Sequence, residues 1–306
     1  MAYFQNGTAK IYYEDVGKGE VIFTNHGVTE DTTYWSEPGV TAALAEHYRV
    51  ISIDMRGHGR TIIEGDPKGF DEVTMGDDFT ALADHLGLDK FHILSHATGG
   101  MYAARYGIRH SDRLHSLMLT DTGSETLPRM FRADGHEITD EEMAKNRKLA
   151  EQAQQQWADR EPPPPPSYIQ RREGWRANRD VFTFKMAEHP YADRMYEIMD
   201  DWGQRRISQQ ALMEFYGSFY TDPDPMVEGL RGIKCPVLLL IGEFDYVFIK
   251  PTELMAREIP DNRHVVMRGL GHMTAIEAPK WTSHELLDFL SCVRETGRAM
   301  PGSSGV

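Results

Sequence analysis

Residues 91–101, FHILSHATGGM, hold the pattern that decides the fold of this chain. The first four are mostly apolar, which is typical of a buried strand. The small residues that follow, up to Gly100, are typical of a tight turn into a helix. Ala97 lies at the apex of this predicted turn. A strand that turns sharply into a helix is the repeating unit of an α/β fold.

The same alternation of strand and helix extends in both directions from this stretch. Short apolar segments predict further strands at 21–24, 50–53, 117–120, 237–241 and 264–267. Helical patterns lie between them, as at 77–86 and 101–110. We therefore expect an α/β fold with a mostly parallel sheet and helices on both of its faces. In such sheets the functional site lies at the carboxyl ends of the strands.

Residues 127–225 interrupt this alternation. They contain a charged helical pattern at 140–160, five prolines at 162–166 and aromatic-rich helical patterns at 196–202 and 209–220. We expect an α/β core built from 1–126 and 226–295, a helical lid at 127–225 and a flexible tail at 296–306.

Composition excludes several classes of function. The formal net charge of −14 argues against partners that are nucleic acids or anionic membranes. No apolar stretch approaches the 18 residues of a membrane span, and no secretory signal is visible. Two cysteines cannot form a cysteine-based zinc site. We expect a cytoplasmic protein with a small-molecule substrate and with neither a metal nor a cofactor. The oligomeric state is left open between a monomer and a homodimer.

Two polar residues follow the last two predicted strands. Asp245 comes after the strand at 237–241, and His272 comes after the strand at 264–267. Both residues are therefore expected at the carboxyl edge of the sheet. A carboxylate beside a histidine fixes the tautomer of the imidazole and stabilises its protonated form. Asp121, after the strand at 117–120, is the rival carboxylate.

These motifs, together with NHGV at 25–28 and DMRGHG at 54–59, resemble those of α/β-hydrolases of the lid-bearing, esterase and haloperoxidase-like kind. The resemblance covers roughly 10–126 and 226–292. It implies that Ala97 occupies the nucleophile position of the G-x-S-x-G elbow, with Asp245 as the acid and His272 as the base. A methyl group cannot attack a carbonyl. The loop at 54–59 is interpreted as structural.

The resemblance also implies an oxyanion hole formed by the backbone N–H groups of Val28 and Thr98, which need no particular side chain. We expect the hydroxyls of Ser95 and Thr98 to point away from the elbow, so that neither replaces the missing nucleophile. His96, beside the elbow, is interpreted as a packing residue that also borders the substrate. The abundance of aromatic residues in 127–225 favours a bulky, apolar or aromatic substrate. The residues predicted to bind it are His26, Trp35, His96, Trp202, Phe219 and Met273.

The sequence thus predicts a carboxylic ester or lactone hydrolase in a form that lacks its nucleophile, as an engineered serine-to-alanine substitution would leave it. One alternative is a lyase or cofactor-free oxygenase that uses His272 and Asp245 as a general base. Another is a relative that binds a ligand without catalysis. The residues do not identify the substrate, nor do they separate cleavage of an ester from that of a lactone, an amide or a carbon–carbon bond.

Overall fold

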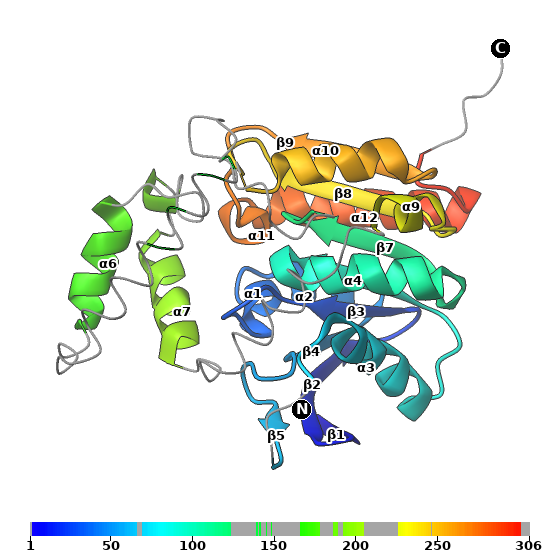
Figure 1. Cartoon of the computed structure of the whole chain (residues 1–306), viewed down its shortest axis with the longest axis horizontal. Coiled ribbons are helices and arrows are strands. Elements are labelled where there is room, and N and C mark those ends of the chain that lie inside the picture. Colours follow the sequence, from blue (N-terminus) through cyan, green and yellow to red (C-terminus); the bar gives the residue numbers. More distant parts are fainter. Residues whose placement is uncertain are drawn as a thin grey trace.

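The computed structural model describes residues 2–65, 69–123, 166–177, 186–188, 192–204, 226–245 and 247–300, together with single residues at 139, 141, 145 and 148. These residues form a nine-stranded sheet in the order β1-β2-β4-β3-β6-β7-β8-β9, with β5 beside β2 (Figure 1). The strands that run parallel are β4 (Arg49–Ile53), β3 (Val21–Asn25), β6 (Phe91–His96), β7 (Leu114–Thr120), β8 (Val237–Gly242) and β9 (Asn262–Met267). The predicted α/β fold with a mostly parallel sheet is confirmed.

The sequence-based prediction missed three antiparallel strands, which are β1 (Ala2–Asn6), β2 (Ala9–Gly17) and β5 (Ile62–Ile63). The hairpin between β1 and β2 turns at Gly7, which has a positive φ of 59°. Asn6 is the last residue of β1 and pairs with Ala9, so the two-residue loop is Gly7-Thr8. A glycine at the first position of such a loop supplies the positive φ that tight hairpin turns need. Gly7 is therefore the signal that would have located these two strands.

Helices cover both faces of the sheet (Figure 1). One face carries α3 (Glu72–His85), α4 (Ala97–His110), α9 (Met226–Arg231) and α10 (Ile249–Glu258). The other carries α1 (Thr33–Ser36), α2 (Val40–Ala45), α11 (Thr274–Glu277) and α12 (Pro279–Thr296). Strands β3, β6 and β8 are buried along their whole length, which explains why they read as largely apolar runs, whereas the edge strand β9 is only partly buried.

The chain between β7 and β8 includes α6 (Tyr168–Ala177), the short 3-10 helix η2 (Met186–Glu188) and α7 (Ala192–Gln204). Helix α7 contacts the core, because Trp202 Nε1 donates to Thr33 Oγ1 at 2.7 Å and Arg194 pairs with Glu37 at 2.7 Å. Most of 127–225, including the helices predicted at 140–160 and 209–220, lies outside the described residues. The lid therefore stays a prediction.

The tail departs from its prediction. Ala299 is fully buried, and its carbonyl accepts a hydrogen bond from Arg263 Nε on β9 at 2.9 Å. The flexible tail predicted from residue 296 is therefore wrong as far as Ala299, and residues 301–306 lie outside the described part.

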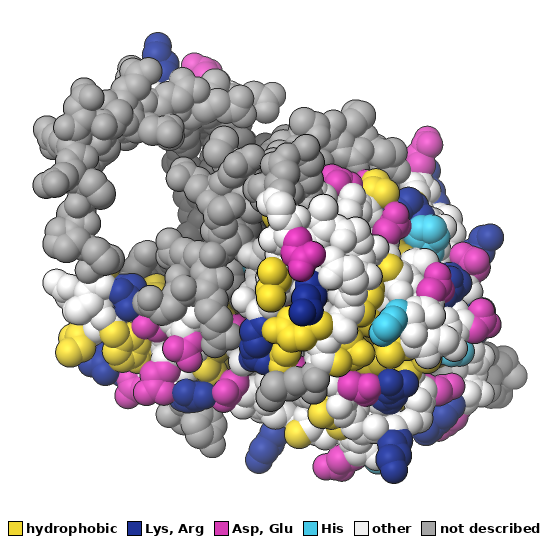
Figure 2. All heavy atoms as spheres, turned by 90° about the horizontal axis from the view of Figure 1, so that it is seen from below, with side chains coloured by type: hydrophobic (Ala, Val, Ile, Leu, Met, Phe, Trp, Pro, Cys, Tyr) yellow, Lys and Arg dark blue, Asp and Glu magenta, His cyan; other side chains and the backbone are white. Residues whose placement is uncertain are grey.

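Acidic and basic side chains are interspersed with apolar ones on the face that Figure 2 shows. Among the helices in the described part of the chain, none combines the length and the hydropathy needed to cross a membrane.

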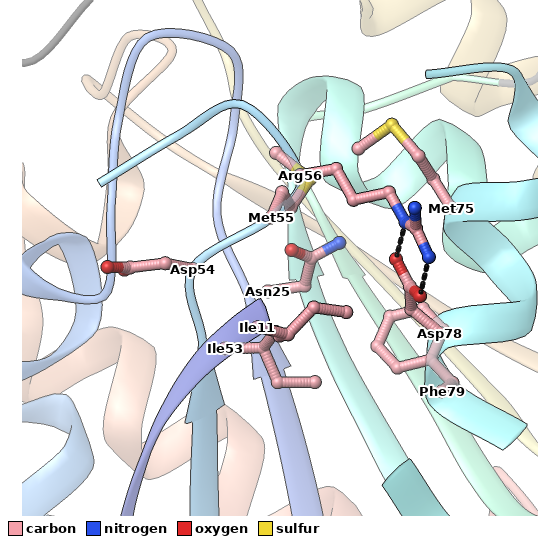
Figure 3. A pocket seen from close by; sticks show the side chains of 9 residues that line it. All are labelled: Ile11, Asn25, Ile53, Asp54, Met55, Arg56, Met75, Asp78 and Phe79. Atoms are coloured by element: carbon pink, nitrogen blue, oxygen red, sulfur yellow. Dashed lines mark hydrogen bonds and ion pairs between the residues drawn. The ribbon is translucent and has the colours of Figure 1, made fainter. Parts of the chain in front are cut away.

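The loop at 54–59 braces the carboxyl ends of β3 and β4. The Asp54 carboxylate accepts from the backbone N–H groups of Thr32 (2.8 Å) and Arg60 (2.7 Å). The buried Arg56 guanidinium makes a two-pronged ion pair with Asp78 of α3, at 2.7 and 2.9 Å (Figure 3). These groups border a cavity of about 20 Å³, enough for one water molecule. Its lining is Ile11, Asn25, Ile53, Asp54, Met55, Arg56, Met75, Asp78 and Phe79.

This buried ion pair predicts a large loss of stability when one partner is removed. Asp78→Ala should lower the free energy of unfolding by about 3–5 kcal/mol, because the Arg56 charge would stay buried without its counterion. Asp15→Ala is the matched control, since it removes a carboxylate from a partly exposed pair with Arg49. It should cost at most about 1 kcal/mol. Urea denaturation measures both, and equal losses would refute the structural importance of the Arg56 pair.

Candidate active site

Backbone strain gathers at the carboxyl ends of three neighbouring strands. In the described part of the chain, the non-glycine residues with positive φ are Thr29 (66°), Ala97 (48°) and Asp121 (49°). They follow β3, β6 and β7, which are adjacent in the sheet. Such conformations cost about 1–3 kcal/mol each and tend to occur at functional sites. The strain therefore marks this edge of the sheet as the candidate site.

The predicted strand-to-helix turn is present at Ala97. Strand β6 ends at His96, and α4 begins at Ala97 itself. The turn is held through its backbone, since the Thr122 hydroxyl donates to the Ala97 carbonyl. Helix α4 also approaches the loop after β3 so closely that a Cβ on Gly99 would lie 2.1 Å from the His26 carbonyl oxygen. None of these contacts needs a hydroxyl at position 97.

His272 and Asp245 come together as the sequence predicts. His272 Nδ1 lies 2.8 Å from Asp245 Oδ2, and both side chains are buried. The other Asp245 oxygen accepts from the backbone N–H of Phe248 at 3.2 Å, and the Phe248 ring stacks on the imidazole at 5.4 Å between centroids. This contact holds Nδ1 toward the carboxylate. The catalytic roles of the pair stay predictions.

Asp121 is the alternative candidate for the acid. Its carboxylate accepts hydrogen bonds from the backbone, whereas His272 Nδ1 contacts Asp245. One of the Asp121 oxygens accepts from Gly242 N at 3.1 Å, and the other accepts from the backbone N–H and the hydroxyl of Thr274 at 3.1 and 2.6 Å. Burial raises the pKa of Asp121, and the neighbouring His96 opposes that rise. Asp121 thereby ties the end of β8 to the first turn of α11, directly after His272.

Glu277 is a residue of the site that sequence reasoning missed. Its buried carboxylate accepts from Gly271 N at 3.0 Å and from Met273 N at 3.1 Å, which are the backbone groups on either side of His272. Burial raises its pKa, while these two hydrogen bonds act in the opposite direction. The available signal was an acidic residue in a short stretch of small and apolar residues after the histidine.

One of the two proposed oxyanion donors, the backbone N–H of Val28, is hydrogen-bonded to a side-chain hydroxyl. Val28 N donates to Thr98 Oγ1 at 2.6 Å, so the Thr98 side chain turns toward the loop after β3. The expectation that this hydroxyl points away from the elbow is therefore wrong. The Thr98 backbone N–H lies in the first turn of α4, where helix amides have no partner within the helix. Ser95, in contrast, is fully buried, and its hydroxyl lacks a hydrogen-bond partner within the described part of the chain.

Two residues predicted to bind substrate make structural contacts. His26 is fully buried; its Nδ1 contacts the Gly27 carbonyl oxygen at 2.8 Å, and its Nε2 accepts from Met55 N at 3.1 Å. Neither ring nitrogen is left for a ligand. Trp35 is also buried, and its indole N–H donates to the Asn25 carbonyl at 2.9 Å. Both rings hold the loop after β3 against its neighbours, and their contact with a substrate stays a prediction.

The remaining predicted binding residues have mixed outcomes. Trp202 and Met273 are both buried in the cluster on the α12 side of the sheet. Phe219 lies outside the described residues. A contact between these three and a substrate stays a prediction. Within the described ranges, no group of three or more His, Cys, Asp or Glu side chains could hold a metal ion.

His96 is more than a packing residue. Its ring is fully buried and stacks on Tyr34 at 4.0 Å between centroids. Nε2 lies 3.4 Å from a Glu30 oxygen, and Nδ1 lies 3.6 Å from Asp121 Oδ2. Burial lowers the pKa of His96, but the two carboxylates outweigh this effect and raise it to about 9. Glu30 was missed by sequence reasoning because only the fold brings it to His96.

Comparisons of sequence and structure find related proteins. Residues 20–279 match the family described as alpha/beta hydrolase fold. A putative carbamate hydrolase from Caulobacter is 26% identical, with 94% of this chain and 98% of the relative covered. A non-heme haloperoxidase from Rhodococcus erythropolis is 24% identical, with 92% and 96% covered. The structure of a thermophilic esterase from Thermogutta terrifontis superposes with a TM-score of 0.67 at 26% identity, covering 93% of this chain and 94% of that one.

The close approach of α4 predicts that Gly99→Ala is damaging. The added methyl would overlap the His26 carbonyl, so either α4 or the loop after β3 must move. We expect the free energy of unfolding to fall by about 1–3 kcal/mol. Gly174→Ala is the control, because nothing lies within 4 Å of its added Cβ in α6, and it should be neutral or slightly stabilising. A stable Gly99→Ala variant would contradict the packing described for the turn.

Proposed function

The chain belongs to the alpha/beta hydrolase fold family, and we propose that its site is that of a serine hydrolase for carboxylic esters or lactones, present here without its nucleophile. The observation that carries this proposal is the buried His272–Asp245 pair, at 2.8 Å, on the same sheet edge as the strained turn at Ala97. The relatives named as a carbamate hydrolase and an esterase support hydrolysis as the reaction class.

With serine at position 97, the reaction follows in two steps. The hydroxyl oxygen attacks the carbonyl carbon while His272 Nε2 takes the proton, and Asp245 stabilises the imidazolium through Nδ1–H. The backbone N–H groups of Val28 and Thr98 receive the oxyanion. His272 then gives its proton to the leaving alkoxide, which leaves an acyl-enzyme. A water molecule, deprotonated by His272, releases the acid and restores the serine.

The proposed substrate has a bulky, apolar or aromatic group. Support comes from the aromatic-rich sequence of 127–225 and from the contact of Trp202 in α7 with the segment that follows the oxyanion loop. Pockets lined mostly by apolar and aromatic side chains favour ligands of that kind.

The first test is to restore the hydroxyl. Ala97→Ser should raise turnover of a nitrophenyl acylate by ~10⁶, because the proposed base, acid and oxyanion donors all follow strands at the same edge of the sheet. The chain with Ala97 should retain at most a residual rate. Oxyanion donors and substrate binding alone leave a rate acceleration of roughly 10³–10⁴-fold over the reaction in water. Steady-state kinetics and labelling with a serine-directed phosphonate measure both effects.

His272→Gln in the Ala97→Ser background is the control, and it should abolish both turnover and labelling. Absence of hydrolysis of aryl esters, alkyl esters and lactones by Ala97→Ser, together with no labelling, would overturn the proposed function.

A second candidate function is favoured by the contact between His272 and Asp245 in a chain that has a methyl group at position 97. In that case the pair acts as the general base of a lyase or cofactor-free oxygenase, and the chain as written is fully active on its own substrate.

The Thr98 hydroxyl sets a further expectation. It accepts the Val28 N–H that the oxyanion needs, so it must rotate away before a substrate carbonyl binds. Displacing one hydrogen bond costs about 1 kcal/mol. In the Ala97→Ser background, Thr98→Ala should therefore raise kcat/KM about fivefold.

Thr98→Ser keeps the hydroxyl and should stay close to the Ala97→Ser parent. A fall in kcat for Thr98→Ala, with Thr98→Ser unaffected, would mean that the hydroxyl itself donates to the oxyanion rather than blocking the site.

A further inference from the structure

His96 lies where the two halves of the site meet. It is the last residue of β6, directly before the turn at Ala97, and its ring is closed in on all sides. Glu30 and Tyr34 face it from the segment after β3, Asp121 faces it from the end of β7, and His272 faces it from the loop after β9. The Tyr34 hydroxyl lies 3.0 Å from Nδ1, and the His272 ring centroid lies 5.0 Å from that of His96.

The two carboxylates beside His96 each hold a different loop. Glu30 Oε2 accepts from Gly27 N at 2.7 Å, one residue before the proposed oxyanion donor Val28. Asp121 accepts from Thr274, two residues after His272, and from Gly242 at the end of β8. His96 therefore connects the oxyanion loop, through Glu30, with the histidine loop and the acid strand, through Asp121.

Charge balance decides the state of this ring. Two buried carboxylates with no cation between them would repel each other in a region without water, which is costly. Each ring nitrogen of His96 lies within ion-pair distance of one of them, at 3.4 and 3.6 Å. Neither contact is a direct hydrogen bond: Nε2 has no hydrogen-bond partner among the described residues, and Nδ1 contacts the hydroxyls of Tyr34 at 3.0 Å and Thr120 at 3.4 Å. A doubly protonated ring places a positive charge between the two carboxylates, which a neutral ring does not.

We propose that His96 is a buried imidazolium that acts as a positioning residue, holding the oxyanion loop and the histidine loop in register across the turn at Ala97. It touches neither substrate nor the reacting atoms and acts through Glu30 and Asp121. The effect on activity rests on the proposed function, whereas the charge of His96 does not.

The pH dependence has a definite sign. The pKa of His96, about 9, lies above its ordinary value of 6.5, so the ion-paired state is complete below about pH 6.5 and is lost as the pH rises through about 9. Burial tends to raise the pKa of Glu30, but His96 and neighbouring groups lower it overall. Burial and the two carboxylates hold the pKa of Tyr34 well above 10. Neither of these two neighbours therefore titrates in the range where His96 does.

The direct test uses the chain as it stands and needs no catalysis. In ¹⁵N-histidine-labelled protein, His96→Gln assigns the His96 signals by removing them. Both ring nitrogens should have imidazolium shifts at pH 7.5, and these shifts should titrate with a midpoint near pH 9. Neutral-ring shifts of His96 at pH 7.5 would overturn the proposal.

The functional test compares pH profiles in the Ala97→Ser background. Glu30→Gln and Asp121→Asn each remove one counterion of His96. The apparent pKa of the alkaline limb in the kcat/KM profile should therefore fall by at least one unit in each variant. Asp15→Asn removes an exposed carboxylate distant from the site and should leave the limb in place. Unchanged limbs in both variants would refute the positioning role. If Ala97→Ser hydrolyses nothing, the proposed function fails, and the NMR titration still decides the charge of His96.

Discussion

Hydrogen bonds from backbone N–H groups to buried carboxylates hold this site together. Each loop at the carboxyl edge of the sheet wraps around such a group. Glu30 accepts from the loop after β3, and Asp54 accepts from Thr32 in the same segment. Asp245 accepts from the turn before α10, and Glu277 accepts from the loop that carries His272. Asp121 links the end of β8 to α11. An unpaired buried charge is costly, so each carboxylate fixes its loop in the one shape that supplies donors. The same edge holds the strained residues Thr29, Ala97 and Asp121.

This arrangement separates the shape of the site from its reactivity. The turn at Ala97 is fixed by the Thr122 hydroxyl, by the close packing of Gly99 on the His26 carbonyl and by β6 itself. The missing hydroxyl contributes to none of these contacts. These contacts therefore hold the turn in place with alanine at its apex, and the contact between His272 and Asp245 is present as well.

Local patterns predicted the elements that are buried on both faces, because a parallel strand shows as an apolar run and its functional residue follows at the carboxyl end. Asp245 and His272 were found in this way. Glu30 and Glu277 were not, because an acid that accepts backbone N–H groups has the same local sequence as an acid on the surface. The Thr98 hydroxyl was misjudged, since its rotamer depends on the amide of Val28, a residue 70 positions earlier. The structural contacts of His26 and Trp35 were not predicted, because sequence gives proximity to the site but not the direction of a ring.

The segment from Val28 to Glu37 contacts two different helices, α4 and α7. Its first residue offers the amide at the elbow, while Thr33 and Glu37, farther along, receive Trp202 and Arg194 from α7. Helix α7 and the turn at Ala97 are therefore joined through one continuous stretch of chain. Under the proposed function, a substitution in α7 would reach the Val28 amide through this stretch without itself touching the substrate.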